Sequence, residues 1–431
     1  MKILLLNQCF YPDVVSTAQH LTDLATALTS RGHEVTVVAS DRGYDDPTRR
    51  FARREEWNGI EIIRIRTLSL GKGAKWRRAF SFASFLSLCA LRLITLPRFD
   101  VVVALTSPPL ISFLATLFVK LKGGSLCSWV MDLNPDEAIA AGWLDEHSQT
   151  SRFLQRLSNY SFHSAARTIV LDRFMKERVI AKGVKPDRVV IIPPWSHDDN
   201  VSYSQTGREV FRRTHGFEDR FVVMYSGNHS PCHPLDTLLD AAHKLKVRSE
   251  IVFCFIGGGS EQAKVREFAA HHELQNVYCL PYQPLNDLSS SLSAADLHVV
   301  VMGEKFVGIV HPCKVYNIMT VGAPALYIGP TPSHITDIAT QHSKFVLTRH
   351  GDVEGVTQAI REVGSGQYRN AVASGFEVDP TLPRYGTDPA QASHGFSKQD
   401  LLPQLIGIIE SVQDVHDFSG LKDEVRAGGT F

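Results

Sequence analysis

The chain has 431 residues, of which 44% are hydrophobic and 21% charged, the proportions of a folded globular protein. Its 45 lysines and arginines balance its 45 aspartates and glutamates, so no net charge favours nucleic acid or another highly charged partner. The length exceeds that of one typical core and predicts two domains.

Seven cysteines are scattered along the chain and form no Cys-x-x-Cys pair. Most lie in apolar runs, as small core residues do in a reducing compartment. This pattern argues against a disulfide framework and a structural zinc site, and no metal is expected. The apolar run at Lys2–Leu6 is too short for a secretory signal, so a cytoplasmic location is expected.

Short apolar runs alternate with amphipathic stretches in the first half of the chain. The stretch Thr17–Ser30 has apolar residues at helical spacing and ends at Arg31-Gly32-His33. Buried strands are expected at Ile3–Leu6, Glu34–Ala39, Ile60–Arg66, Phe99–Leu105, Ser125–Met131, Thr168–Leu171 and Val189–Ile192. Strand–helix alternation predicts a parallel, doubly wound sheet.

A basic segment precedes an apolar one between the third and fourth of these strands. The basic residues are Lys72, Lys75, Arg77 and Arg78, and the apolar ones are Phe80, Phe82, Phe85, Leu86 and Leu88. This pairing fits a helix lying on anionic lipid, and it fits equally a core helix behind a solvated basic loop. A membrane span is not expected, because Arg92 interrupts the apolar run Phe80–Leu96.

The strand–helix pattern restarts after a linker at residues 193–200. Further strands are expected at Phe221–Tyr225, Ile251–Ile256, Val277–Leu280, Leu297–Val301, Ala325–Ile328 and Phe345–Leu347. We therefore expect an N-terminal domain at 1–197 and a C-terminal domain at 205–390, both Rossmann-like and facing a central cleft. Residues 368–394 have the composition of a long connection. A helix at 396–413 is expected to pack back on the N-terminal domain, followed by a frayed tail at 417–431.

The segment Gly308–Met319 is the most informative one in the chain. A glycine-led loop runs into a short helix whose first turn contains Lys314. Such a terminus with an added lysine can hold an anion, and a diphosphate is the natural guest. The alternative is an ordinary loop-to-helix junction with a surface lysine.

Four loops in the second half follow expected strands. The loop Ser226–Pro234 contains Gly227, Asn228, His229 and His233, which could approach and hydrogen-bond a phosphate. The triplet that starts at Gly257 alone is weak evidence. Tyr282 and Gln283 follow a strand where a flat base could lie, and Glu304 could accept hydrogen bonds from sugar hydroxyls, although an exposed glutamate is the simpler reading.

Three carboxylates follow the strand that ends at Met131. Asp132, Asp136 and Glu137 could bind hydroxyls or transfer protons. Asp136 and Glu137 fit a helix with an acidic first turn equally well, but Asp132 at the strand end does not. The motifs of dehydrogenases, P-loop enzymes, zinc proteases and serine hydrolases are absent from the sequence.

Taken in order, these segments resemble the retaining glycosyltransferases of family four, which have the GT-B fold. The matching motifs are Phe10-Tyr11-Pro12-Asp13, Arg31-Gly32-His33-Glu34, Asp132-Leu133-Asn134-Pro135, Ile191-Ile192-Pro193-Pro194, Ile256-Gly257-Gly258-Gly259, Ala294-Ala295-Asp296-Leu297 and His311-Pro312-Cys313-Lys314. The motifs Thr106-Ser107-Pro108-Pro109 and Asp132-Leu133-Asn134-Pro135 resemble a branch that builds bacterial surface polysaccharides.

The resemblance implies transfer of a hexose or N-acetylhexosamine from a nucleotide diphosphate, UDP foremost, to a saccharide or lipid-linked acceptor, without an obligatory metal. It implies catalytic roles for Lys314, His229 and Asp132. The implied donor-binding residues are Gly227, Asn228, His233, Gly257, Tyr282, Gln283, Glu304, Gly308, Ile309, Val310, His311, Pro312 and Asn317. The implied acceptor-binding residues are Thr17, His20, Asp136 and Glu137.

The sequence departs from the family pattern at three places. Ile309 and Asn317 stand where the family has the glutamates of its Glu-x7-Glu pattern, and histidines replace the basic pair of the Gly227 loop. The glycine pair before the first long helix is Val15-Ser16. Two alternatives therefore remain beside a glycosyltransferase at the cytoplasmic membrane face: a sugar-nucleotide epimerase of the same architecture, and a non-catalytic protein that binds a nucleotide or a partner.

Overall fold

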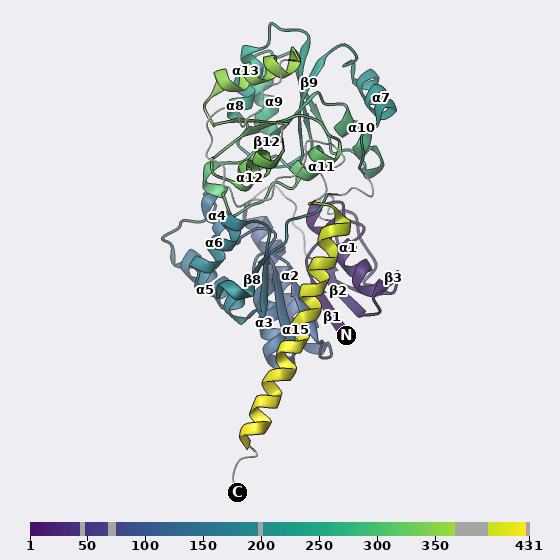
Figure 1. The fold of residues 1–431 in the computed structure, drawn as a ribbon, viewed down its shortest axis with the longest axis vertical. Coiled ribbons are helices and arrows are strands. Elements are labelled where there is room, and N and C mark those ends of the chain that lie inside the picture. Colours follow the sequence, from purple (N-terminus) through teal and green to yellow (C-terminus); the bar gives the residue numbers. More distant parts are fainter. Residues whose placement is uncertain (44–47, 68–74, 197–200, 343, 367–394, 428–431) are drawn as a thin grey trace. The chain divides into compact units, whose positions relative to one another are not determined.

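The protein is described by a computed structural model over residues 1–43, 48–67, 75–196, 201–342, 344–366 and 395–427. These residues form two compact units, Met1–Pro194 with Leu401–Phe431, and Trp195–Asp400. Each unit is a sheet of mostly parallel strands with helices on its faces (Figure 1). The two parallel-sheet α/β units confirm the fold class expected from the sequence.

The first unit contains an eight-stranded sheet in the order β3-β4-β2-β1-β5-β6-β7-β8. Its strands are β1 (Lys2–Leu6), β2 (Glu34–Ser40), β3 (Arg54–Trp57), β4 (Ile60–Ile65), β5 (Val101–Ala104), β6 (Ser125–Trp129), β7 (Arg167–Val170) and β8 (Val189–Ile191). Its helices are α1 (Ser16–Ser30), α2 (Lys75–Thr95), α3 (Ile111–Lys122), α4 (Asp136–Ala140), α5 (Gln149–Ser164), α6 (Arg173–Ala181), η1 (Pro186–Arg188) and α15 (Lys398–Ala427). The strands are apolar almost throughout because helices cover both faces.

The second unit contains a six-stranded parallel sheet in the order β11-β10-β9-β12-β13-β14. Its strands are β9 (Phe221–Ser226), β10 (Ile251–Ile256), β11 (Val277–Leu280), β12 (Leu297–Val301), β13 (Ala325–Ile328) and β14 (Phe345–Thr348). Its helices are α7 (Gln205–His215), α8 (Asp236–Lys244), α9 (Gln262–His271), η2 (Leu285–Asp287), α10 (Leu288–Ser293), η3 (Glu304–Phe306), α11 (Lys314–Thr320), α12 (His334–Gln341) and α13 (Val353–Gly364). Asp296, the residue before β12, forms salt bridges with Arg208 and Arg212 of α7 and so holds this helix against the sheet.

Strand β3 is an antiparallel edge strand that the parallel pattern did not predict. It pairs with β4 through a hairpin whose two loop residues, Asn58 and Gly59, have φ angles of 50° and 75°. An Asn-Gly pair with two positive φ angles is the preferred two-residue hairpin turn. The sequence signal was therefore present, but Arg54–Trp57 is too polar to read as a buried strand.

Helix α2 packs on the sheet, as a core helix does. Phe85 is fully buried among sheet residues, and Leu86 and Leu88 pack partly against the same core. Phe80, near the helix start, is 44% exposed. Lys72 lies outside the described residues, as does the side chain of Lys75. Among the described residues, no helix is both long enough and apolar enough to cross a membrane.

Helix α15 is longer than the predicted helix at 396–413. It continues to Ala427, through Gly420, into the region expected to be a frayed tail. A glycine inside a helix costs only about 1 kcal/mol and does not by itself end it. Most of the predicted connection at 368–394 lies outside the described residues, as does the end of the chain after Ala427.

The C-terminal helix is bonded to the first unit at the end of α1. Glu410 accepts from Arg31 Nη1 at 3.0 Å and contacts His33 Nε2 at 2.9 Å. The hydrogen bond from His33, followed by that from Arg31, holds the pKa of Glu410 below its usual value. Leu405 and Ile409 on the same helix are fully buried.

We predict that Glu410→Gln lowers the unfolding midpoint at pH 7 but has little effect near pH 3. A carboxylate with a lowered pKa stabilises the fold above its unfolded pKa and loses that effect as the pH falls. The loss is about 1 kcal/mol or less, because the pair is partly exposed. Thermal unfolding at both pH values measures it, with the exposed Glu267→Gln as control. A loss independent of pH would contradict the charge-based account.

Candidate functional site

The strand order of the second unit creates an opening at the carboxyl edge of its sheet. β9, β10 and β11 proceed in one direction, and β12 then returns to the other side of β9. The ladder between β9 and β12 holds only two residue pairs, so these strands separate toward their carboxyl ends. Ligands in doubly wound sheets bind at such a reversal of strand order.

Glycines allow the loops after β9 and β10 to cross at this opening. Gly227, Gly257 and Gly259 have φ angles of 137°, 133° and 130°. A Cβ atom on Gly257 would lie 2.1 Å from the carbonyl oxygen of Gly227, and one on Gly259 would lie 2.2 Å from that of His229. The loops are then joined by a hydrogen bond from His229 N–H to Gly258 O at 2.7 Å. Larger residues cannot occupy these positions without separating the loops.

Lys314 places a buried ammonium group at the same opening. Its Nζ lies 3.5 Å from the centre of the Tyr225 ring, and it would lie 3.0 Å from a Cβ on Gly227. Among the described residues this nitrogen has no hydrogen-bond partner. Burial lowers the pKa of Lys314 to about 7. The packed face of α11 fixes the lysine in place through Val315, Tyr316, Ile318 and Met319.

Three histidines lie near Lys314, His229 and His298 buried and His233 half-buried, and all three are neutral at pH 7. Burial first, and the charge of Lys314 second, lowers the pKa of His229 to about 4 and that of His233 to about 3. Burial also lowers the pKa of His298 to about 4. His233 Nδ1 lies 2.7 Å from the carbonyl oxygen of Val301, so this nitrogen carries the hydrogen. The ammonium is therefore the sole cation among these four groups.

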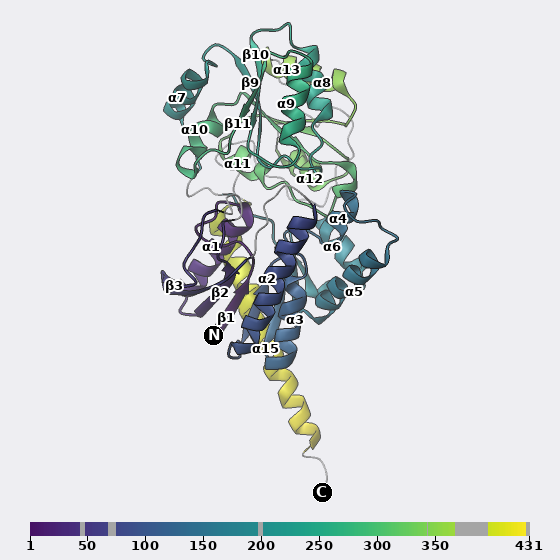
Figure 2. The same cartoon turned by 180° about the vertical axis from the view of Figure 1, so that it is seen from behind.

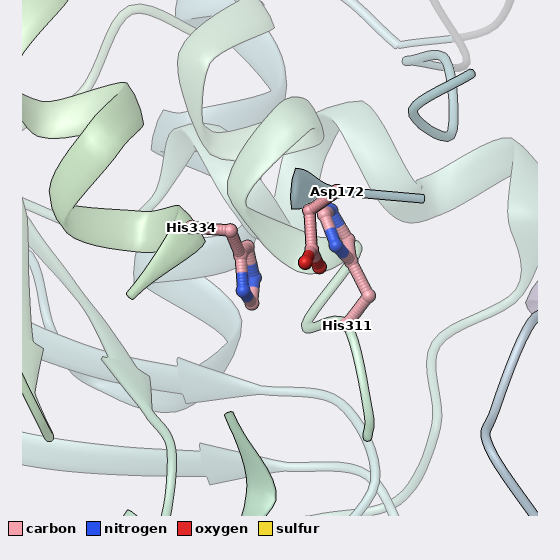
Figure 3. Close-up of side chains that lie close together, drawn as sticks. All are labelled: Asp172, His311 and His334. Carbon is pink, nitrogen blue, oxygen red and sulfur yellow. The ribbon is translucent and has the colours of Figure 1, made fainter. Parts of the chain in front are cut away.

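His311 precedes α11 and is directed toward Tyr316 on that helix and His334 on α12. Its Nε2 lies 2.7 Å from the hydroxyl of Tyr316, and its ring stacks on that of His334 with centroids 3.9 Å apart (Figure 3). Both histidines are almost completely buried. These contacts give His311 a clear structural role, and donor binding by its side chain stays a prediction.

Some backbone groups of the Gly308 loop already form hydrogen bonds within the protein. The N–H groups of Ile309 and Val310 both donate to the carbonyl oxygen of Phe306, at 2.9 and 3.2 Å. The carbonyl of Pro312 accepts from Val315 N–H at 3.3 Å. α11 has only seven residues. The Lys314 side chain, rather than a helix terminus, is thus the main anion-attracting feature here.

The remaining predicted donor residues lie around the opening with varied exposure. Tyr282 is 47% exposed and its ring lies against Gly257 and Gly258. The Gln283 amide donates to Pro281 O at 2.9 Å, and Asn228 O accepts from the Tyr225 hydroxyl at 2.7 Å. The other three are Glu304, which is exposed, Gly308, which is buried with a φ of 69°, and Asn317, which is half-buried.

Tyr225 and His298 belong to the site but were not predicted from the sequence. The Tyr225 ring lies against the Lys314 ammonium. Its place one residue before the carboxyl end of β9 is the feature of the sequence that could have indicated a position near the site. His298 lies inside β12, and the apolar residues around it in the sequence gave no sign of a functional position.

In the first unit, Asp132 lies at the carboxyl edge of the sheet, beside the loop that follows β5. Its N–H donates to Thr106 Oγ1 at 3.2 Å. Burial first, and the charge of Glu137 second, raises the pKa of Asp132 to about 8. The carboxyl group is therefore mostly protonated at pH 7 and can donate a hydrogen bond.

The four predicted acceptor-binding residues are placed differently from one another. Asp136 pairs with Lys182 at 2.8 Å, and Glu137 accepts from Asn134 at 3.3 Å. His20 is 1% exposed, with Nδ1 lying 2.8 Å from Ser16 O. Thr17 is half-buried in the first turn of α1. Asp136, Glu137 and His20 thus make contacts within the protein, and acceptor binding by the four residues stays a prediction.

We predict that Asp132→Asn raises the unfolding midpoint more at pH 8.5 than at pH 5. A folded-state pKa near 8 means that the folded protein binds more protons than the unfolded chain between about pH 4 and 8. Stability from this group is therefore lost as the pH rises through that window, and asparagine removes the loss. Thermal scans of both proteins at the two pH values provide the measurement. An equal effect at both would show that Asp132 ionises normally.

Comparisons with known proteins identify both units. Residues 17–195 match the glycosyl transferase 4-like domain, and residues 207–373 match the glycosyl transferases group 1 domain. WcaI of Escherichia coli (strain K12), described as a colanic acid biosynthesis glycosyl transferase, is 24% identical over 379 residues, or 84% of this chain and 92% of WcaI. WbjE of Pseudomonas aeruginosa, named a glycosyltransferase, is 26% identical over 241 residues, or 56% of this chain and 60% of WbjE.

Solved structures establish the fold. HepE of Anabaena, in complex with UDP and glucose, has a TM-score of 0.69 at 16% identity, covering 95% of this chain and all of HepE. Sucrose-phosphate synthase of Thermosynechococcus elongatus has a TM-score of 0.71 at 13% identity, covering 96% of this chain and all of that protein. With both domain families matched in order, the chain belongs to the GT-B glycosyltransferases that its motifs resemble, alongside relatives from bacterial polysaccharide biosynthesis.

Proposed function

We propose that the protein is a retaining glycosyltransferase that moves a hexose or N-acetylhexosamine from a UDP-sugar to a saccharide or lipid-linked acceptor in polysaccharide biosynthesis. The observation that carries the proposal is the buried Lys314 ammonium, which has no hydrogen-bond partner among the described residues. A buried charge without a partner is costly unless a ligand completes the site. The diphosphate of the donor supplies the missing negative charge.

The site suits a diphosphate in shape as well as in charge. Gly227 has no side chain, so Lys314 can lie against its main chain, and Gly257 lets the Gly227 carbonyl approach closely, which keeps the two loops together beside the ammonium. The neutral His229 ring can donate a hydrogen bond without adding a second buried charge. Tyr282 lies beside the same glycines and is exposed enough to contact the base.

Catalysis in this proposal is mainly electrostatic. As the bond between the sugar and the diphosphate breaks, negative charge grows on the departing phosphate. An ammonium held in a site that excludes water stabilises this charge more than one in water does. Lys314 therefore acts on the leaving group, and His229 supports it by hydrogen bonding.

The first unit supplies the acceptor side of the proposed reaction. Asp132 carries a proton at pH 7 and would orient an acceptor hydroxyl by hydrogen bonding. UDP and glucose are the ligands named for HepE, and they guide the choice of donor here. A cytoplasmic location at the inner face of the plasma membrane remains the expectation from the sequence.

We predict that Lys314→Met weakens UDP-sugar binding at least about tenfold, because a charge-assisted contact contributes roughly 1.5 kcal/mol or more. The same change should raise the stability of the ligand-free protein by roughly 1–3 kcal/mol, since it removes a buried ammonium without a partner. A thermal-shift panel of nucleotide sugars measures both effects, because a ligand at a hundred times its Kd stabilises by about 2.7 kcal/mol.

The control for this experiment is Lys246→Met, an exposed lysine at the other edge of the same sheet. Unchanged ligand affinity in Lys314→Met would disprove the assignment of the diphosphate site. With the donor identified, proton NMR of the product tests retention of the anomeric configuration. Tight donor binding with no turnover on any saccharide acceptor would favour the non-catalytic alternative, which the isoleucine and asparagine at 309 and 317 keep open.

We predict that UDP-sugar affinity falls above pH 7 by a factor approaching ten per pH unit. Lys314 loses its proton above a pKa of about 7 in the free protein, whereas the bound diphosphate requires the protonated form. Below pH 7 the lysine is already charged and the affinity levels off. Calorimetry from pH 6 to 9 measures this, with Lys314→Met as the pH-independent reference. A flat profile in the wild type would refute the coupling.

A further inference from the structure

The chain passes between the two units twice, and residues of the second unit beside the two passages are bonded to each other. The passages lie at residues 194–195 and 400–401. Ser196 N–H donates to the carbonyl oxygen of Phe396 at 2.8 Å, and Ser196 Oγ donates to the same oxygen at 3.3 Å. Ser196 is 1% exposed, so these bonds are shielded from water. The segments by which the chain enters and leaves the second unit are thus joined at Phe396.

The start of α15 fixes the main chain of Phe396 from the other side. Ser397 directly precedes this helix, and its Oγ accepts from Asp400 N–H at 3.1 Å and donates to the Asp400 carboxylate at 2.6 Å. A serine in this position satisfies a backbone N–H that the first turn of a helix leaves without a partner. Phe396 therefore lies between a capped helix and the bond to Ser196.

The side chain of Phe396 contacts the helix that carries Lys314. Its ring centre lies 4.9 Å from that of Tyr316, which is 2% exposed and is the third residue of α11. Aromatic rings at this distance attract each other beyond the effect of burial. The Tyr316 hydroxyl in turn lies 2.7 Å from Nε2 of His311, before the helix. Because a helix of seven residues is not stable in isolation, such contacts decide where α11 lies.

We propose that Phe396 is a positioning residue for Lys314. Its ring holds the first turn of α11 through Tyr316, while its main chain is held by Ser196 and by the start of α15. The ammonium is thereby fixed relative to the point at which the chain enters and leaves the second unit. The catalytic meaning of this inference rests on the proposed function, in which a shift of about 1 Å at the leaving group can cost about 100-fold in rate.

The protonation of Lys314 reports how firmly α11 is held. A lysine stem is flexible, and its head group moves into water wherever the packing around it allows, which raises the pKa toward the ordinary value. Four other titratable groups of the second unit lie near the ammonium: Tyr225 on β9, His229 and His233 in the loop after it, and His298 on β12. All four are uncharged at pH 7, because burial raises the pKa of the tyrosine and lowers the pKa values of the histidines.

The test measures the pKa of Lys314 in the full chain by acetylation at different pH values. Trace acetic anhydride labels only unprotonated amines, and mass spectrometry of the peptide that contains Lys314 follows its labelling from pH 6 to 11. The midpoint of the profile gives the pKa, whereas accessibility to the reagent changes only its height. The exposed Lys246 serves as the reference within each sample.

Two variants remove the contact to different extents, and two serve as controls. Phe396→Ala removes the ring, and Phe396→Leu keeps a smaller apolar side chain. Phe396→Tyr restores an aromatic ring. Phe268→Ala removes another half-buried ring of the second unit, which lies 4.4 Å from the ring of His272. Phe268 is on α9, which Figure 2 shows in front of the sheet, and the last turn of this helix lies near the amino ends of the strands, opposite the edge at Lys314.

We expect a Lys314 midpoint near pH 7 in the wild type, in Phe396→Tyr and in Phe268→Ala. The midpoint should lie at least about one pH unit higher in Phe396→Ala and should move in the same direction, by less, in Phe396→Leu. The pH above which UDP-sugar affinity falls should rise by the same amounts. At pH 6, where Lys314 is protonated in every variant, kcat of Phe396→Ala should be at least about tenfold lower, because the ammonium is displaced from the leaving group.

An unchanged midpoint in folded Phe396→Ala would overturn the proposal, as would an equal shift in Phe268→Ala or a wild-type midpoint near that of Lys246. If Phe396→Ala does not fold, an unchanged midpoint in Phe396→Leu has the same force. The labelling needs no nucleotide. A wild-type protein that binds no UDP-sugar would therefore refute the proposed function and leave the positioning of Lys314 by Phe396 to be decided by the labelling profiles.

Discussion

A single buried ammonium group determines how the second unit can work. Lys314 is held over the Tyr225 ring, at the point where β9 and β12 separate. Burial disfavours its charged form, and burial first and the charge of Lys314 second lower the pKa of His229 and keep that ring neutral. Gly227 lets the lysine lie against the main chain, and Gly257 and Gly259 let the loops beside it cross. The unit therefore contains a buried positive charge without a counter-charge, which an incoming diphosphate can neutralise.

Rigid packing keeps the Lys314 ammonium in place, so that it can act on a ligand. A flexible lysine would move its head group into water and avoid the cost of burial. Here Val315 and Tyr316 on α11 are buried, and the crossed loops are bonded through His229 and Gly258. The charge is fixed before the ligand arrives, so little reorganisation is needed when charge develops on the leaving group.

Much of the fold could be predicted from the sequence, because apolar runs and helical spacing record burial directly. The parallel strands were located to within a residue or two, and β3 was missed because edge strands are short and polar. Lys314 and the Gly227 loop could be proposed from the sequence because a glycine-containing loop after a strand and a lysine at the start of a helix are local patterns of anion sites. Tyr225, His298 and the bonded N–H groups of Ile309 and Val310 depend on contacts between distant segments, which periodicity does not encode.

The departures from the family pattern explain why the ammonium is so poorly compensated. Residue 317 follows Lys314 by three positions on α11, and side chains at this spacing lie on the same helix face. A glutamate there, as the family has, would stand near the ammonium and raise its pKa. Asn317 offers no charge, and Ile309 removes the other carboxylate of the pattern. With neutral residues at both positions, burial alone sets the lowered pKa of Lys314, and under the proposed function the diphosphate supplies the missing negative charge.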